Sequence, residues 1–169
     1  MEVFEAVRTV LAVRRYGERR VPPEIIARIV EAGHLSASSQ NLQPWHFVVV
    51  EEHATLRAIG EIIRTGRYTA GASFAIAVFV EKESHFARSD ASRAIQNMIL
   101  TAWSEGIGSN WTGFGAMPAI QQLLGVPESY GGLAVLPFGY PAEALGRGRK
   151  QRKPIGEVAS RERFGTPFV

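Results

Sequence analysis

The chain contains no cysteine among its 169 residues. This absence excludes disulfides, thiolate metal ligands and a cysteine nucleophile. No apolar run approaches the roughly 20 residues that a membrane-spanning helix needs. The first residues include Glu2, Glu5 and Arg8, so they lack the apolar segment of a secretory signal. The sequence therefore predicts a cytoplasmic protein with no membrane partner.

Several catalytic motifs are also missing. No glycine cluster completes G-x-G-x-x-G after a strand, and neither a Walker A loop nor a G-x-S-x-G nucleophile elbow occurs. No two histidines stand four residues apart, so the chain predicts no zinc site. Carboxylates do not pair near any candidate pocket, which argues against glycosidase chemistry. None of these motifs therefore assigns an activity to the chain.

The composition that is present describes one folded unit. Hydrophobic residues make up 46% of the chain and charged residues 21%, which predicts a single domain over residues 1–169. The net charge of +3 is modest, and the basic stretch lacks interleaved aromatics, so we expect no nucleic-acid partner. Seven cations nevertheless gather near the C-terminus: Arg147, Arg149, Lys150, Arg152, Lys153, Arg161 and Arg163. They form either a solvated tail or a site for a compact anion such as phosphate.

Hydrophobic periodicity divides the chain into alternating helices and strands. It predicts helices over residues 2–11, 22–33, 54–65, 90–105 and 118–125, the fourth with Asp90 as its N-cap. It predicts strands over residues 45–51, 72–80, 109–112 and 133–138, with the second as a central strand. This order allows a parallel α/β sheet or an α+β layer fold, and the pattern alone does not choose between them.

The segment Ser36–Val50, SASSQNLQPWHFVVV, joins a run of hydroxyl and amide side chains to a buried strand. A polar loop fixed to the start of a core strand can aim donors and acceptors at a ligand. The loop contains no strong acid, base or nucleophile. We therefore interpret it as a cradle for a bound group.

Four landmarks in order carry a family resemblance. They are V-R-R-Y at residues 13–16, the S-S-x-N-x-Q-P-W-H-F type of segment at residues 38–47, G-I-G-S-N-W-T-G at residues 106–113, and R-K-Q-R-K-P-I-G-E-V at residues 149–158. With these landmarks the chain resembles the FMN-dependent nitroreductase family over nearly its whole length.

The resemblance implies an α+β fold with a central, mainly antiparallel sheet flanked by helices, in an intertwined homodimer. It implies FMN at the subunit interface, NADH or NADPH as the reductant, and a small-molecule acceptor such as a nitroaromatic or a quinone. The tail, residues 141–169, is then expected to pack on the partner subunit. No side chain is expected to be an obligate acid or base, because the flavin carries the chemistry.

On the phosphate side, the resemblance assigns three cations. Arg14 matches a basic position beside the phosphate and ribityl chain, and Lys150 and Arg152 match tail cations that hold the phosphate. A dianionic phosphate needs such charge-assisted donors. Arg14 is also the first candidate for a cation near flavin N1 and O2, and Arg67 is the second.

On the ring side, the resemblance assigns a loop and a turn. Ser38, Ser39 and Asn41 match the loop that lines the isoalloxazine ring from the second subunit. Thr112 and Gly113 match a turn near flavin N5, where a backbone N–H can contact the nitrogen. Glycine permits that close approach.

The chain departs from the family pattern in its first landmark. Val10 and Ala12 stand where the family's R-x-S-x-R motif carries arginine and serine. Either Arg8, Arg15 or Arg149 substitutes for these contacts, or FMN binds more weakly. The loss motivates an alternative, a flavin-binding or storage protein with little turnover. Flavin-dependent dehydrogenation or dehalogenation of a dedicated substrate is a third reading.

A second departure is a short connection before the long helix. Many members of the family have an additional helical segment there, which covers the flavin. Here only residues 81–89 join the middle strand to the helix. The sequence thus predicts a more open flavin face.

Overall fold

A four-stranded antiparallel sheet organises the chain, in the order β1-β2-β4-β3. The computed structural model describes residues 1–145 and 150–168, so Arg147 and Arg149 lie outside the described residues. The strands are β1 (Trp45–Val50), β2 (Phe74–Glu81), β3 (Gly108–Ser109) and β4 (Tyr130–Gly139). The helices are α1 (Val3–Thr9), α2 (Pro23–His34), α3 (His53–Ile62), α4 (Ala87–Ser104) and α5 (Met117–Leu123), with short 3₁₀ turns η1 (Ser39–Asn41), η2 (Arg64–Gly71) and η3 (Ile155–Glu157).

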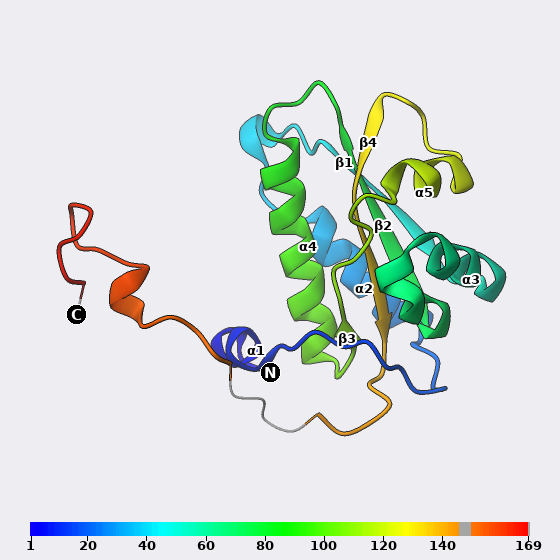
Figure 1. Ribbon diagram of the computed structural model, residues 1–169, viewed down its shortest axis with the longest axis horizontal. Helices are drawn as coiled ribbons and strands as arrows, with labels where there is room; N and C mark the ends of the chain where they lie inside the picture. The colour runs from blue at the N-terminus through cyan, green and yellow to red at the C-terminus, as the bar shows by residue number, and fades with distance from the viewer. Residues whose placement is uncertain (146–149, 169) are drawn as a thin grey trace.

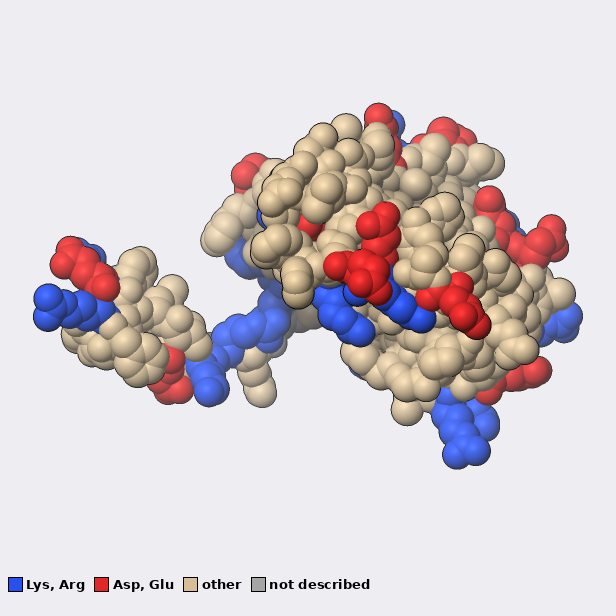
Figure 2. Space-filling view, turned by 90° about the horizontal axis from the view of Figure 1, so that it is seen from above, with Lys and Arg blue, Asp and Glu red and all other residues tan. Residues whose placement is uncertain are grey.

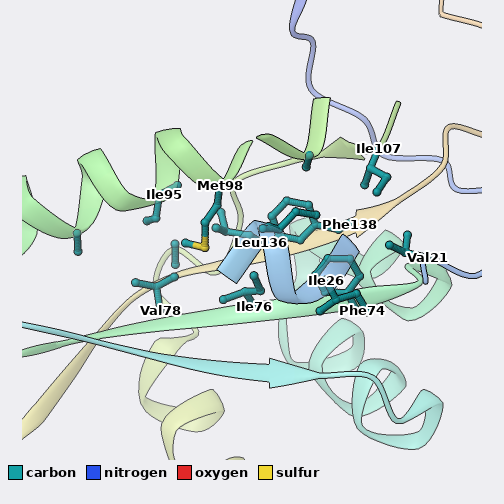
Figure 3. Packing of buried hydrophobic residues seen from close by; sticks show 14 of the residues in the cluster. Val21, Ile26, Phe74, Ile76, Val78, Ile95, Met98, Ile107, Leu136 and Phe138 are labelled. Carbon is teal, nitrogen blue, oxygen red and sulfur yellow. The ribbon is translucent and has the colours of Figure 1, made fainter. Parts of the chain in front are cut away.

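Helices cover both faces of this sheet (Figure 1). Because successive side chains of a strand point to opposite faces, β2 serves two cores. Phe74, Ile76 and Val78 pack with residues of α2 and α4 (Figure 3). Ala75 and Phe79 pack on the other face with residues of α3 and α5. The α+β architecture expected from the resemblance is confirmed, and the parallel alternative is wrong.

The predicted elements occur in the predicted order, with differences at their ends. The third strand is only Gly108–Ser109, and Thr112 forms an isolated bridge with Val135 instead of continuing it. The last strand begins at Tyr130, earlier than predicted. The two glycines that follow Tyr130 have low strand propensity, so the sequence pattern does not indicate that the strand starts there. Pairing with β2 along its whole length compensates for that low propensity.

The start of α4 corrects one prediction. The helix begins at Ala87 after Phe86, three residues before the expected position, so Asp90 is not its N-cap. Asp90 lies inside the first turn and is completely buried. An aspartate with no solvent exposure requires partners, and these are described with the site below.

The chain beyond residue 150 projects away from the body (Figure 1). It contains only the short turn η3, and Ile155, Val158 and Phe164 are exposed on it. Packing of this tail on a partner subunit stays a prediction. Among the helices described here, none is both long and apolar enough to cross a membrane.

Candidate functional site

The segment after α1 is attached to the edge of the sheet at β3. Val13 N–H donates to the Ser109 carbonyl over 2.8 Å, and Ala12 pairs with Ser109 in a parallel bridge. Gly108 permits this approach, since a Cβ there would lie 2.2 Å from Val13 Cγ2. The first landmark is therefore held against the third.

Tyr16 fixes the same segment from the other side. Its hydroxyl lies 2.8 Å from the Val13 carbonyl and 3.1 Å from the Pro137 carbonyl, so both can accept its hydrogen. Burial, the largest cause, and the neighbouring Tyr68 raise the pKa of Tyr16 well above its ordinary value. The ring packs against Gly139, where a Cβ would come within 2.9 Å. Tyr16 is thus a neutral hydrogen-bond donor that positions Arg14 and Arg15.

A hollow of about 540 Å³ opens between α1, α4 and β3, and we call it the α1–β3 hollow. Lys150 and Arg152 line it together with Val10 and Ala12, the two positions that depart from the family motif. Figure 2 shows Lys and Arg side chains gathered where the tail leaves the body. The structure therefore brings the tail cations Lys150 and Arg152 together with the two positions that depart from the family motif, while the assignment of a phosphate to this hollow stays a prediction.

Lys150 is held at the rim of this hollow by α1. Its ammonium donates to the Val7 carbonyl over 2.6 Å. Partial burial, and then the nearby Arg152, lower the pKa of Lys150. Two neighbouring cations repel each other, and an anion bound between them would offset this repulsion. This arrangement fits a compact anion.

Two of the three proposed substitute cations are already paired. Arg8 forms a two-point ion pair with Glu5 at 2.8 and 2.9 Å. Arg15 lies 3.0 Å from Glu143, with both side chains largely exposed. The third, Arg149, lies outside the described residues. Lys150 and Arg152 are therefore the cations that the described structure brings to the α1–β3 hollow.

The hollow also contains neutral donors that the sequence did not single out. Trp111 lines it, and its indole N–H is buried without a hydrogen-bond partner among the described residues. A buried donor without a partner is uncommon in a folded protein and fits a site that expects a ligand. The only signal in the sequence was its place inside the third landmark.

The two backbone amides that the resemblance assigns near flavin N5, at residues 112 and 113, differ in their hydrogen bonds. Thr112 N–H donates to the Val135 carbonyl at 2.9 Å and is not free for a ligand. Gly113 N–H donates to none of the described residues. Gly113 has a φ of +103°, and a Cβ there would lie 3.2 Å from Val135 N. Of the two amides that the resemblance places near flavin N5, only that of Gly113 is thus without a partner among the described residues.

Arg14 and Arg67 occupy different places. Arg14 is exposed and lines a smaller hollow of about 190 Å³ that shares Ala12 with the α1–β3 hollow. Arg67 lies on η2 and lines a separate hollow with Arg57 and Glu61 of α3. Arg14 thus lines a hollow that adjoins the α1–β3 hollow at Ala12, without lining the same hollow as Lys150 and Arg152, and Arg67 lies at a separate one.

Ser38, Ser39 and Asn41 belong to a loop at the other end of α4, which we call the 38–43 loop (Figure 1). The Ser39 N–H donates to the buried Asp90 carboxylate in the first turn of α4, at 2.9 Å. The α1–β3 hollow is lined by Gln96 and Ile99, farther along the same helix. Within one chain, the ring-side loop and the phosphate-side cations are thus separated along α4.

Comparison with known proteins identifies relatives of this chain. The sequence pattern of the nitroreductase family matches residues 8–72 and 65–140. The chain is 37% identical over 154 residues to a protein of Methanothermobacter thermautotrophicus with the provisional name NADH dehydrogenase/NAD(P)H nitroreductase, covering 86% of this chain and 81% of that protein.

Solved structures agree with the sequence match. A Bacteroides thetaiotaomicron protein with the same provisional name superimposes with a TM-score of 0.88 at 28% identity, covering 96% of this chain and 98% of the other. An FMN-dependent nitroreductase from Clostridium difficile gives 0.82 at 25% identity, covering 86% and 91%. Fold, landmarks and sequence together show that this chain belongs to the nitroreductase family.

Proposed function

We propose that the chain is an FMN-dependent NAD(P)H oxidoreductase that reduces small acceptors such as nitroaromatics or quinones. The observation that carries the proposal is the α1–β3 hollow, which brings Lys150 and Arg152 together with Val10, Ala12 and residues 109–111 of the third landmark. A related structure is an FMN-dependent nitroreductase, which supports the same cofactor. Bound FMN would accept a hydride from NAD(P)H and pass two electrons to the acceptor, giving NAD(P)⁺ and the reduced product.

The site we propose needs two copies of the chain. The 38–43 loop is attached to α4 at Asp90, whereas Gln96 and Ile99 line the hollow roughly 9–14 Å farther along the helix axis. By the family resemblance, such a loop meets the flavin from the second subunit. A second subunit would supply the loop to the hollow of the first. The exposed faces of α1 and the tail offer apolar surface for that contact, through Val3, Phe4 and Phe164.

The chain's own residues would divide the work of holding FMN. Lys150 and Arg152 would neutralise the phosphate, and Arg14 would face the ribityl chain or the flavin edge. Gly113 N–H would meet the ring where the hydride is carried. Because Val10 and Ala12 add no polar group, we expect weaker phosphate binding than a complete R-x-S-x-R motif would give.

The connection between β2 and α4 bears on acceptor choice. Only residues 82–86 join the two elements, and they contain no helix. No additional segment is thus available there to cover the ring. We therefore propose an open face that accepts several small aromatic oxidants.

Purification tests the proposal directly. We expect a yellow protein with flavin absorbance, or a colourless one that takes up FMN at micromolar concentration. It should oxidise NADH or NADPH when a quinone or nitroaromatic is added. A chain that binds no FMN at that concentration would disprove the proposal.

A second candidate rests on the same hollow. Val10 and Ala12 leave its phosphate side with fewer polar groups, which would suit a flavin-binding or storage protein with little turnover. Steady-state oxidation of NAD(P)H separates the two. Flavin uptake without turnover on any quinone or nitroaromatic favours storage.

A further inference from the structure

The 38–43 loop has an unusual backbone. Gln40, Asn41 and Gln43 have φ values of +52°, +56° and +51°. They are three of the four residues other than glycine with positive φ in the described part of the chain. Residues with a side chain seldom adopt this conformation, and when they do the surroundings must impose it. Something therefore holds the loop.

Two hydrogen bonds join this segment to α4. Ser39 N–H donates to Asp90 Oδ2 at 2.9 Å, and Asn97 Nδ2 donates to Ser36 Oγ at 2.7 Å. Residues seven apart lie on the same face of a helix, so Asp90 and Asn97 form a two-point attachment. Within the loop, Ser38 Oγ accepts from Gln43 N–H at 2.9 Å.

Among the residues that join the 38–43 loop to α4, Asp90 is the one whose burial costs the most free energy. Its side chain is completely buried, whereas a carboxylate normally stays in water. Arg93, one turn later, donates to Asp90 Oδ1, and Ser39 N–H occupies Oδ2. The helix dipole favours an aspartate in the first turn, but it does not require the carboxylate to be buried.

We infer that Asp90 is a positioning residue, which holds the 38–43 loop in its strained conformation so that the loop meets the isoalloxazine ring of the partner subunit's flavin. This inference rests on the proposed flavin site. Asp90 does not touch the flavin in this arrangement. It acts through Ser39 and gives the ring a loop that is already in shape before binding.

The test compares Asp90→Ala and Asp90→Asn with Glu24→Ala. Glu24 also lies in the first turn of a helix, α2, but it is exposed. Asn can still accept the Ser39 N–H, while Ala cannot. Amide hydrogen exchange of the flavin-free full-length protein measures the loop, and fluorescence titration measures the FMN dissociation constant.

We expect faster exchange across residues 38–43 in Asp90→Ala and a dissociation constant raised about tenfold, the size of one hydrogen bond to a charged group. Asp90→Asn should recover most of the affinity, and Glu24→Ala should match the wild type. The visible circular dichroism of bound FMN should change in Asp90→Ala, which a simple loss of stability would not cause in protein that remains folded.

Unchanged loop exchange and unchanged FMN affinity in folded Asp90→Ala would overturn the inference, even if its melting temperature falls. An Asp90→Asn variant as weak as Asp90→Ala would also contradict it, because acceptance of the Ser39 N–H would then not matter. Failure of the wild type to bind FMN would instead reject the proposed function, and the exchange result would still report whether Asp90 holds the loop.

Discussion

Lys150 and Arg152 are the residues on which the phosphate side of the proposed site depends. Among the described residues, Lys150 and Arg152 are the cations that line the α1–β3 hollow. Arg8 and Arg15 form ion pairs with acidic partners of their own. Val10 and Ala12 cannot donate in their place. At the scale of single residues, the proposed phosphate site therefore depends more on the tail cations than on the first landmark.

Replacing Arg152 with Ala should weaken FMN binding about tenfold or more, since a charge-assisted donor to the phosphate is lost. Equilibrium titration of apoprotein checks this. Arg161→Ala is the matched control, because Arg161 lies farther along the tail and donates to the Phe168 carbonyl. Equal affinities for both variants and the wild type would refute the phosphate role of Arg152.

Tyr16 allows a prediction about pH. The pKa of Tyr16 in the folded protein lies above the ordinary value of 10.0, so above pH 10 the hydroxyl ionises more readily in the unfolded chain than in the folded one. The stabilisation from Tyr16 is thus complete below about pH 10 and falls as the pH rises further. Tyr16→Phe should lower the free energy of unfolding by about 1 kcal/mol at neutral pH and remove this alkaline loss.

Urea unfolding of the wild type and Tyr16→Phe between pH 7 and pH 11 measures the difference. Tyr130→Phe is the control, because no hydrogen bond joins the Tyr130 hydroxyl to the described residues. A wild-type advantage that stays constant to pH 11 would contradict the assignment.

At the scale of elements, the site depends on the contact between the segment after α1 and β3. Gly108 is required because Val13 fills the space where its Cβ would stand. The hydrogen bond from Val13 N–H to Ser109 then fixes the backbone that carries Arg14. Close packing means that an added methyl group must displace one of the two elements.

Gly108→Ala should therefore lower stability by about 1–3 kcal/mol and weaken FMN binding, because the Arg14 segment is pushed from β3. Val13→Gly in the same chain should restore part of both losses, because it removes Val13 Cβ as well as the two Cγ atoms, all of which lie within 2.9 Å of the added Cβ. A double-mutant cycle, with thermal unfolding and FMN titration as its two measurements, gives the coupling. Strictly additive losses would show that the two residues do not compete for this space.

At the scale of the whole molecule, one chain leaves apolar surface uncovered. The exposed side chains of α1 include Val3 and Phe4, which are 73% and 70% accessible. The tail adds Ile155, Val158 and Phe164 on a segment that leaves the body (Figure 1). A second copy of the chain would bury this surface and complete the proposed flavin site.

Phe4→Glu should shift the protein from dimer to monomer and abolish FMN binding together with it, since a charge on α1 would oppose burial of this face. Sedimentation velocity at several concentrations measures the association. Leu123→Glu, on an exposed position of α5 at the other face of the sheet, should leave the dimer intact. A wild-type chain that is monomeric at every concentration would disprove the two-subunit site.

The sequence by itself determined the order of the elements and the family to which the chain belongs. The continuous apolar run at residues 72–80 and the 3.6-residue periodicity at residues 90–105 depend only on which side chains are apolar, so β2 and most of α4 could be located without their neighbours. The residues of the four landmarks also identified the family, and the match over residues 8–140 confirms it.

Only the tertiary structure decided what depends on contacts between distant residues. The antiparallel pairing of the strands, the ion pairs of Arg8 and Arg15, and the hydrogen bond that occupies Thr112 N–H are contacts of this kind. Asp90 is the clearest case. Local sequence predicted an N-cap, whereas the fold buries its carboxylate against a loop that lies 51 residues away in the chain. A local pattern cannot contain that information, because the partner arrives only when the chain has folded.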